Sequence, residues 1–126
     1  TGVQTCALPI YQTAAAWFRQ GAEQGSILAQ NNLGDCYYNG QGVEQDYQQA
    51  AIWYRKAAEQ GYAWAQFNLA TCYLDGQGVN SDWQKAAEWY EEAKVQGKDD
   101  EALQKLIQEV YEDYEFLKQD AENDLS

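Results

Sequence analysis

Small and apolar residues recur along the chain with the spacing of amphipathic helices. One set with this spacing is formed by Ala65, Leu69, Cys72 and Tyr73. A second set is formed by Ala50, Tyr54, Ala57 and Ala58. Because residues at such intervals share one side of a helix, each segment has a single face to bury. The pattern therefore predicts pairs of helices that pack through these faces.

Turn residues mark the ends of the predicted helices. Gly76 is placed to end the first helix of its pair, because glycine adopts the left-handed conformation that closes helices. Asp46 and Asp82 precede the next helix, where a carboxylate accepts hydrogen bonds from free backbone N–H groups. Gly61 and Gly97 then stop that helix. The sequence thus predicts a loop within each pair and a tight turn between pairs.

An internal repeat of 36 residues organises the chain. Residues 14–49 and 50–85 align without a gap and are identical at 20 of 36 positions. A third, partial copy follows from Ala86. Tryptophan occupies the same position in each copy, at Trp17, Trp53 and Trp89. Such self-similarity predicts a stack of equivalent units, each of which contacts its neighbours.

The repeat also carries a recognisable motif, A-x-x-x-L-G/A-x-x-Y-x-x-G-x-G-V-x-x-D-x-x-x-A-A-x-W-Y-x-x-A-x-x-x-G. In the first full unit it is matched by Ala29, Leu33, Gly34, Tyr37, Gly40, Gly42, Val43, Asp46, Ala50, Ala51, Trp53, Tyr54, Ala57 and Gly61. The motif resembles the Sel-one-like repeat (SLR), a relative of the tetratricopeptide repeat, over residues 11 to about 97. The resemblance implies an all-α fold, a right-handed α-solenoid of antiparallel helix pairs, used mainly as a binding scaffold.

We expect the chain to divide at the repeat boundaries. The expected parts are a segment foreign to the repeat (1–10), the second helix of a truncated repeat (11–25), two full repeats (26–61 and 62–97), and a C-terminal capping helix with an acidic tail (98–126). The opening stretch TGVQTCALPI resembles the frame translation of a sequencing-library adapter. The repeat phase begins only at Tyr11. Our hypothesis is that residues 1–10 are adapter read-through and that the native protein continues upstream, so localisation is left open.

The C-terminal segment departs from the repeat. Apolar residues continue at intervals of 4, 3, 4 and 3, at Leu103, Ile107, Val110, Tyr114 and Leu117. They predict one long amphipathic helix that caps the stack. A coiled coil has the same intervals, but the stretch covers only about two heptads. Residues 99–126 hold 10 acids and 2 bases, so they carry −8 of the net charge of −12. A solvated outer face is the expected use of this charge, and an acidic docking surface is the alternative.

Composition argues against most chemistry and against two classes of partner. The chain has no histidine, which removes the commonest general base and transition-metal ligand. It has no Ser-x-x-Lys and no GxGxxG phosphate loop. The net charge of −12 disfavours nucleic acid and anionic lipid. We therefore expect no catalysis, no cofactor, no metal, no nucleic acid and no membrane.

Two sets of repeated residues are expected to be structural. Cys36 and Cys72 are one repeat apart, and equivalent sites on stacked helix pairs are too distant for a disulfide. We expect both to be buried and unpaired, as small hydrophobic residues. The tryptophans of the three copies, with Phe18, Tyr54 and Tyr90 beside them, are expected to form the core at the seam between units.

Candidate binding residues are those that vary between copies on the first helix of each unit, because that helix lines the concave groove of the related tetratricopeptide fold. Helical phase selects Leu28, Asn31, Asp35, Tyr38, Trp64, Phe67, Thr71, Leu74, Gln104, Gln108 and Tyr111. Exposed aromatic side chains are typical anchors for a peptide or helix, so Tyr38, Trp64 and Phe67 are the preferred contacts. In the alternative, the C-terminal helix covers Trp64 and Phe67.

The leading functional hypothesis is a protein-interaction scaffold that binds a peptide or protein segment on its concave face. The resemblance also raises a second class of function, because some secreted SLR proteins have been described as penicillin-binding or weakly β-lactamase-like. A third possibility, compatible with the first, is that the chain is a fragment of a larger protein whose activity lies elsewhere.

Overall fold

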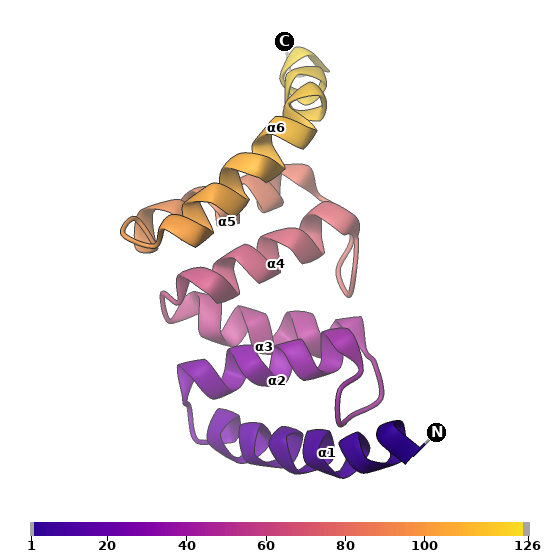
Figure 1. Cartoon of the computed structure of the whole chain (residues 1–126). Coiled ribbons are helices and arrows are strands. Elements are labelled where there is room, and N and C mark those ends of the chain that lie inside the picture. The colour runs from indigo at the N-terminus through magenta and orange to yellow at the C-terminus, as the bar shows by residue number, and fades with distance from the viewer. Residues whose placement is uncertain (1, 125–126) are drawn as a thin grey trace.

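The protein is a stack of helices. The computed structural model describes the backbone of residues 2–124 and the side chains of residues 9–115, 119 and 123. Within this part of the chain the elements are α1 (Gly2–Glu23), α2 (Ile27–Asn39), α3 (Tyr47–Glu59), α4 (Ala63–Asp75), α5 (Trp83–Gln96) and α6 (Glu101–Asp124). Each helix packs against the next along the chain, and the stack is extended (Figure 1). The expected all-α solenoid of helix pairs is confirmed.

The predicted helix ends are confirmed by their hydrogen bonds and backbone angles. The side chain of Asp46 accepts a hydrogen bond of 3.1 Å from the backbone N–H of Gln49. In the next unit, the side chain of Asp82 accepts one of 3.1 Å from the backbone N–H of Lys85. Gly40 and Gly76 close α2 and α4 in the left-handed conformation, with φ of 68° and 67°. The same local chemistry therefore starts and stops the helices of both units.

The second glycine of each GQG sequence joins successive units. Gly42 and Gly78 have φ of 75° and 78°. A Cβ atom at Gly42 would lie 2.1 Å from the carbonyl oxygen of Tyr11, and one at Gly78 would lie 2.1 Å from that of Tyr47. The loop within one helix pair thus rests directly on the backbone of the second helix of the preceding pair. Only glycine allows both this angle and this approach.

Within a unit, small residues let the helices approach closely. A Cβ atom at Gly34 of α2 would lie 2.6 Å from the ring of Tyr54 on α3. Tyr54 is in turn part of one continuous core cluster that runs from α3 to α6 and includes Leu69, Tyr90 and Leu103. Gly34 therefore allows α2 and α3 to pack closely.

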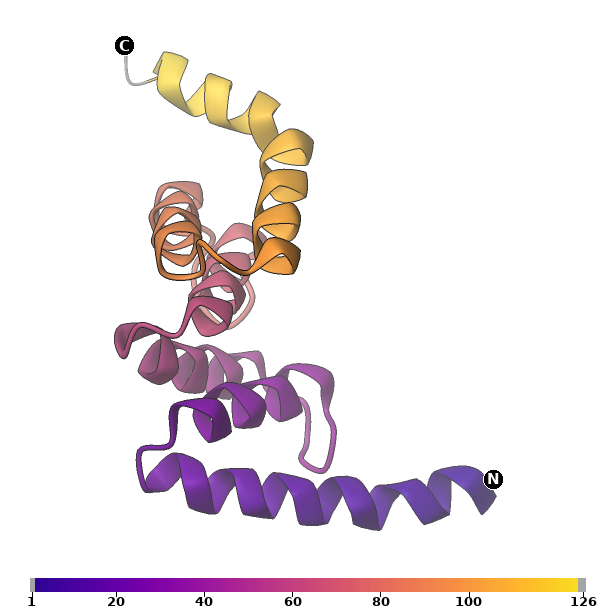
Figure 2. The same cartoon turned by 60° about the vertical axis from the view of Figure 1, so that its left-hand side comes forward.

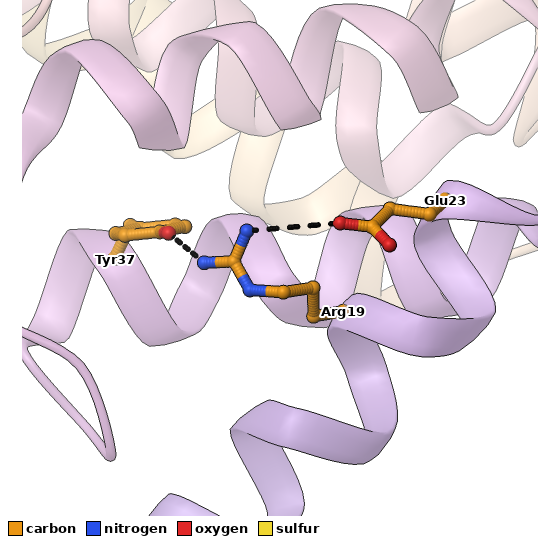
Figure 3. A network of polar contacts seen from close by, with 3 residues as sticks. All are labelled: Arg19, Glu23 and Tyr37. Atoms are coloured by element: carbon orange, nitrogen blue, oxygen red, sulfur yellow. Dashed lines mark hydrogen bonds and ion pairs between the residues drawn. The ribbon is translucent and has the colours of Figure 1, made fainter.

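A polar clasp links α1 to α2, and an equivalent one links α3 to α4. In Figure 3, Nη2 of Arg19 on α1 donates to the hydroxyl of Tyr37 on α2, and Nη1 lies 4.0 Å from Oε1 of Glu23. The guanidinium carbon is 5.6 Å from the Tyr37 ring centroid. Arg55 and Tyr73 repeat the hydrogen bond and the ring contact, at 5.7 Å. The clasp combines a hydrogen bond with a cation–π contact.

The predicted tryptophan core is only partly confirmed. Trp53 is 8% exposed and packs on Ala22 and Leu33 of the preceding helices. Trp89 is partly buried against the main core cluster. For Trp17 the prediction is wrong, because this side chain is 67% exposed and no described helix lies on its side of α1. We call the contacts around Trp53 the first seam and those around Trp89 the second seam.

The two ends of the chain differ from expectation. α1 begins at Gly2 rather than near Tyr11, so the backbone continues as helix through the segment predicted to be foreign. The side chains of residues 1–8 lie outside the described part, and the proposed origin of that segment stays a prediction. The expected division into parts likewise stays a prediction.

The stripe on α6 is buried only in its first half. Leu103 and Ile107 are buried and Val110 is partly buried, as predicted. Tyr114 is 38% exposed, contrary to prediction, and the side chain of Leu117 lies outside the described residues. Figure 2 shows the reason, because the second half of α6 bends away from the stack.

The two cysteines within the described side chains occupy equivalent core positions. Cys36 and Cys72 are both buried and free. Burial raises the pKa of Cys72 to about 12, which keeps the thiol protonated and unreactive at neutral pH. No helix in the described part of the chain is long and apolar enough to cross a membrane.

Candidate peptide-binding face

The residues predicted from helical phase lie on α2, α4 and α6, which we call the α2–α4–α6 face. In Figure 1, α2 and α4 lie in front of α3 and α5, and the first half of α6 continues the same side. The predicted residues divide into polar ones that bind neighbouring helices and aromatic ones that remain partly exposed.

On α2, the predicted residue Asn31 is buried and hydrogen-bonded within the protein. Asn31 is 7% exposed, and its Oδ1 accepts from Nδ2 of Asn68 on α4 at 3.1 Å. Asn31 therefore offers a partner almost no surface, contrary to expectation. Asn68 was not predicted, because sequence spacing does not show which amides meet across two helices.

Asp35 and Thr71 occupy equivalent positions in the two units, and each is hydrogen-bonded to the equivalent tyrosine of its own unit. The hydroxyl of Tyr54 donates to Oδ1 of Asp35 at 2.6 Å. Thr71 Oγ1 and the Tyr90 hydroxyl are 2.8 Å apart. Burial raises the pKa of Asp35, and the hydrogen bond from Tyr54 partly opposes this. Burial also raises the pKa of Tyr90 to about 12, against the lowering effect of Thr71. Both residues position a core tyrosine.

An aromatic run crosses from α4 to α6. The ring centroids of Trp64 and Phe67 are 6.1 Å apart, those of Phe67 and Tyr90 are 5.5 Å apart, and those of Tyr90 and Tyr111 are 6.1 Å apart. All three pairs have edge-to-face geometry, which is favourable for aromatic rings. Tyr90 is buried, whereas the other three rings are partly buried. The run therefore combines core packing with an aromatic surface.

Hydrogen bonds fasten this run to the start of α6. Trp64 Nε1 donates to Oδ2 of Asp100 at 2.8 Å. The other oxygen of Asp100 accepts from the backbone N–H of Leu103 at 3.1 Å and so caps the helix. These hydrogen bonds hold the pKa of Asp100 below its usual range. The start of α6 thus fixes Trp64 but leaves Trp64 and Phe67 partly exposed, between the two alternatives that the sequence left open.

The predicted residues of α6 are largely engaged as well. Gln104 Nε2 donates to the carbonyl oxygen of Gly97 at 2.8 Å and so closes the turn before the helix. The Tyr111 hydroxyl donates to Oε1 of Glu91 at 2.6 Å, and burial raises the pKa of Tyr111. Gln108 is exposed on this helix. These contacts orient α6 on α5.

A narrow apolar hollow lies where α4, α5 and α6 meet, beside Leu74. In the preceding unit, the matching position holds Tyr38, whose ring centroid is 5.1 Å from that of Tyr47 and 6.4 Å from that of Tyr54. Because Leu74 is smaller, the space between Trp83 and its neighbours is left open. The lining residues are Leu74, Trp83, Ala86, Ala87, Tyr90, Val110, Tyr111 and Tyr114.

Trp83 lines this hollow and carries a buried polar group. Its Nε1 is buried and has no hydrogen-bond partner within the described part of the protein. A buried donor without a partner is costly, and it is satisfied when a ligand supplies an acceptor. Among the residues with described side chains, no three His, Cys, Asp or Glu residues are grouped so as to hold a metal ion.

The repeat and its packing define the class of protein. The Sel1 repeat family matches residues 11–26, 27–62 and 65–97. The chain therefore belongs to the Sel1 repeat family, whose members are generally protein-interaction scaffolds. A comparison with curated proteins finds no match.

Solved structures support the same assignment. Protein c5321 of uropathogenic Escherichia coli, a protective antigen with an SLR fold, is 49% identical over 65% of this chain, with a TM-score of 0.64. A Sel1 repeat protein of Oxalobacter formigenes is 38% identical over 66% of this chain, with a TM-score of 0.65. Helicobacter pylori cysteine rich protein B is 26% identical over 73% of the chain, with a TM-score of 0.66.

The chain spans only part of some of these proteins. It covers 18% of the c5321 chain, 63% of the Oxalobacter chain and 68% of the Helicobacter chain.

Proposed function

We propose that the protein is a non-catalytic scaffold that binds a peptide or protein segment on the α2–α4–α6 face. The observation that carries this proposal is the combination of an aromatic run with the adjacent hollow at Leu74. Partly exposed aromatic rings provide contact area at small entropic cost, and a hollow provides a place for an anchoring side chain.

The preferred contacts are Trp64 and Phe67 on α4 with Tyr111 on α6. An apolar side chain of the partner enters the hollow, and a carbonyl group beside it accepts from Trp83 Nε1. Tyr38 contributes less than the sequence suggests, because its hydroxyl already donates to Gln77 and its ring packs on Tyr47. The binding surface is therefore centred on α4 and α6.

Neither the geometry nor the comparisons support the penicillin-binding alternative. Sel1 repeat proteins and the structural neighbours are generally non-catalytic. Two carboxylates beside the aromatic residues of this face, Asp35 and Asp100, accept structural hydrogen bonds from Tyr54 and Trp64. We propose no reaction.

The test uses peptides selected from a random display library on the full chain. Leu74→Tyr is the sharpest variant, because it places in the hollow the residue that already fills the equivalent position at Tyr38. We expect selected peptides to bind this variant and Phe67→Ala at least about tenfold more weakly, as expected for loss of an anchor. Ile52→Ala, which changes an exposed aliphatic residue of α3 outside this face, is the control and should bind normally.

Thermal unfolding separates binding from folding in this test. Leu74→Tyr should keep the melting temperature of the original chain, since the tyrosine is tolerated at the matching site. Selected peptides that bind Leu74→Tyr and Phe67→Ala as tightly as the original chain would refute the proposed face.

A further inference from the structure

The second seam contains an open pocket whose lining residues are not part of the aromatic run. It is formed by the turn between α3 and α4 and by α5. Trp89 lies in its wall, and three carboxylates line it, from Glu59, Glu88 and Glu92. Among the residues with described side chains, the only ion pair within 4.0 Å is that of Arg19 and Glu23, so none of the described cations forms an ion pair with these three carboxylates.

The first seam shows which side chain occupies the equivalent position in the preceding unit. Every residue that lines the pocket has a counterpart 36 positions earlier. At the counterpart site, Nζ of Lys56 lies 4.7 Å from the centroid of the Trp53 ring. The matching position in the second seam is Glu92. The protein therefore covers the first tryptophan with its own cation and places an anion beside the second.

A buried amide repeats the same difference. In the first seam, Oε1 of the buried Gln30 accepts from Nε2 of Gln60 at 2.7 Å. In the second seam, the counterpart donor is Gln96, but its Nε2 points to Oε1 of Glu92 at 3.4 Å. Glu92 thus draws the amide away, which Lys56 cannot do because an ammonium group accepts no hydrogen bond.

The consequence is an unpaired acceptor in the pocket wall. Gln66, the counterpart of Gln30, is 2% exposed, and its Nε2 donates to the carbonyl oxygen of Ala58 at 3.1 Å. Its Oε1 is buried without a hydrogen-bond partner in the described structure. The second seam thus lacks the cation over the tryptophan and the donor to the buried glutamine, both of which the first seam provides.

We propose that this pocket binds an arginine side chain of a partner protein, stacked on Trp89, between the carboxylates of Glu59, Glu88 and Glu92, and donating to Oε1 of Gln66. A guanidinium group is planar, stacks on indole and carries several N–H donors, so one group supplies the charge, the ring contact and the missing hydrogen bond. The ammonium of lysine provides the charge without the flat fork. The site is separate from the α2–α4–α6 face and does not depend on the function proposed for it.

The direct test uses N-acetyl-arginine methylamide as the probe and the indole N–H signals of the ¹⁵N-labelled chain as the readout. The Trp89 signal is assigned by its loss in Trp89→Phe. At low ionic strength we expect a saturable shift of the Trp89 signal with a Kd of about 1–10 mM, as for one desolvated cation contact. The citrulline analogue, which keeps the donors but lacks the charge, should bind at least about tenfold more weakly. The lysine analogue should bind more weakly than the arginine probe.

The variant Glu92→Lys tests the internal comparison. It recreates the first seam, because the new ammonium group covers Trp89 and frees Gln96 to donate to Gln66. We expect it to remain folded with an unchanged or higher melting temperature and to lose the arginine response. Glu44→Lys, an exposed residue with the same change of charge, is the control and should retain the response.

Three results would overturn the proposal. They are an arginine probe that shifts no Trp89 signal up to about 50 mM, an equal response to the citrulline analogue, and an equal loss in Glu92→Lys and Glu44→Lys. The first result would indicate that Gln96 turns to satisfy Gln66 within the protein. The third would indicate a general effect of net charge.

Discussion

The first and second seams are built on the same backbone and differ in a few side chains. In both, a tryptophan of the second helix faces the tight turn of the preceding unit, beside a buried glutamine. In the first, Lys56 covers Trp53 and Gln60 satisfies Gln30. In the second, Glu92 replaces the cation and the acceptor of Gln66 is left unpaired.

The difference shows how a repeat acquires a distinct site without changing its fold. Residues that dock one unit on the next are kept, whereas residues at the rim of the seam vary. One change of sign at the rim both removes a cation from the tryptophan and redirects an amide. The same principle applies at the hollow, where Leu74 in place of a tyrosine leaves space that the preceding unit fills.

The largest expected effect separates the two tryptophans. We expect Trp53→Ala to lower the free energy of unfolding by about 4 kcal/mol, because it removes a nearly buried indole and leaves a cavity. Trp89→Ala should cost about 1–2 kcal/mol, since part of that ring already meets solvent. Urea denaturation measures both. Equal losses would mean that the second tryptophan is as much a core residue as the first.

The next effect tests the backbone docking that both units share. Gly78→Ala should cost about 3 kcal/mol, because a methyl group at positive φ would overlap the Tyr47 carbonyl oxygen. Gly42→Ala should behave alike through Tyr11. Gly25→Ala is the control, because Gly25 has φ of 94° but a methyl group there would meet no atom within 4 Å, so it should cost only about 1 kcal/mol. A loss at Gly25 that equals the loss at Gly78 would show that backbone angle alone matters.

A smaller effect compares Asp35 with its neutral counterpart Thr71. Burial raises the pKa of Asp35 from its ordinary value of 3.8, so ionisation disfavours the folded state as the pH rises through the raised pKa. We expect Asp35→Asn, which can still accept from Tyr54, to raise Tm at pH 7 by about 1–3 °C. The advantage should disappear near pH 3, where the carboxyl is protonated in both states. A gain that persists at pH 3 would point to a cause other than ionisation.

The smallest effect converts the first seam into the second. Lys56→Glu should cost about 0.5–1 kcal/mol, the usual value of an exposed cation–π contact. It should also draw Gln60 away from Gln30 and make the Trp53 indole responsive to the arginine probe. Thermal unfolding and the indole N–H signals measure these two changes. A variant that loses stability but gains no response would show that Lys56 supports the seam without excluding a ligand.

Much of the fold could be predicted from local signals. Asp46, Asp82, Gly40 and Gly76 act within a few residues of their own positions, so sequence alone locates the helix ends. The 36-residue offset also predicts that units stack. The prediction failed at Trp17 and Tyr114, because burial at these positions depends on whether another helix lies beside them, which no local pattern states.

The contacts made by the candidate binding residues could be predicted from the sequence only in part. Helical phase assigns the candidate residues to one side of α2, α4 and α6, and their role in binding stays a prediction. It could not show that Asn31 meets Asn68, that Asp100 fastens Trp64, or that Trp83 borders a hollow, since each depends on side chains brought together from different helices.

By itself, the sequence determined that this protein is a Sel1 repeat solenoid, because helix periodicity, caps and turn glycines act over short distances and recur with the repeat. Only the tertiary structure decided which copies of a repeated residue find a hydrogen-bond partner and a compensating charge. Lys56 and Glu92 look like ordinary surface variation along the chain. Their meaning appears when a tryptophan, a glutamine and a neighbouring turn meet, because hydrogen bonding and charge compensation depend on distances across helices.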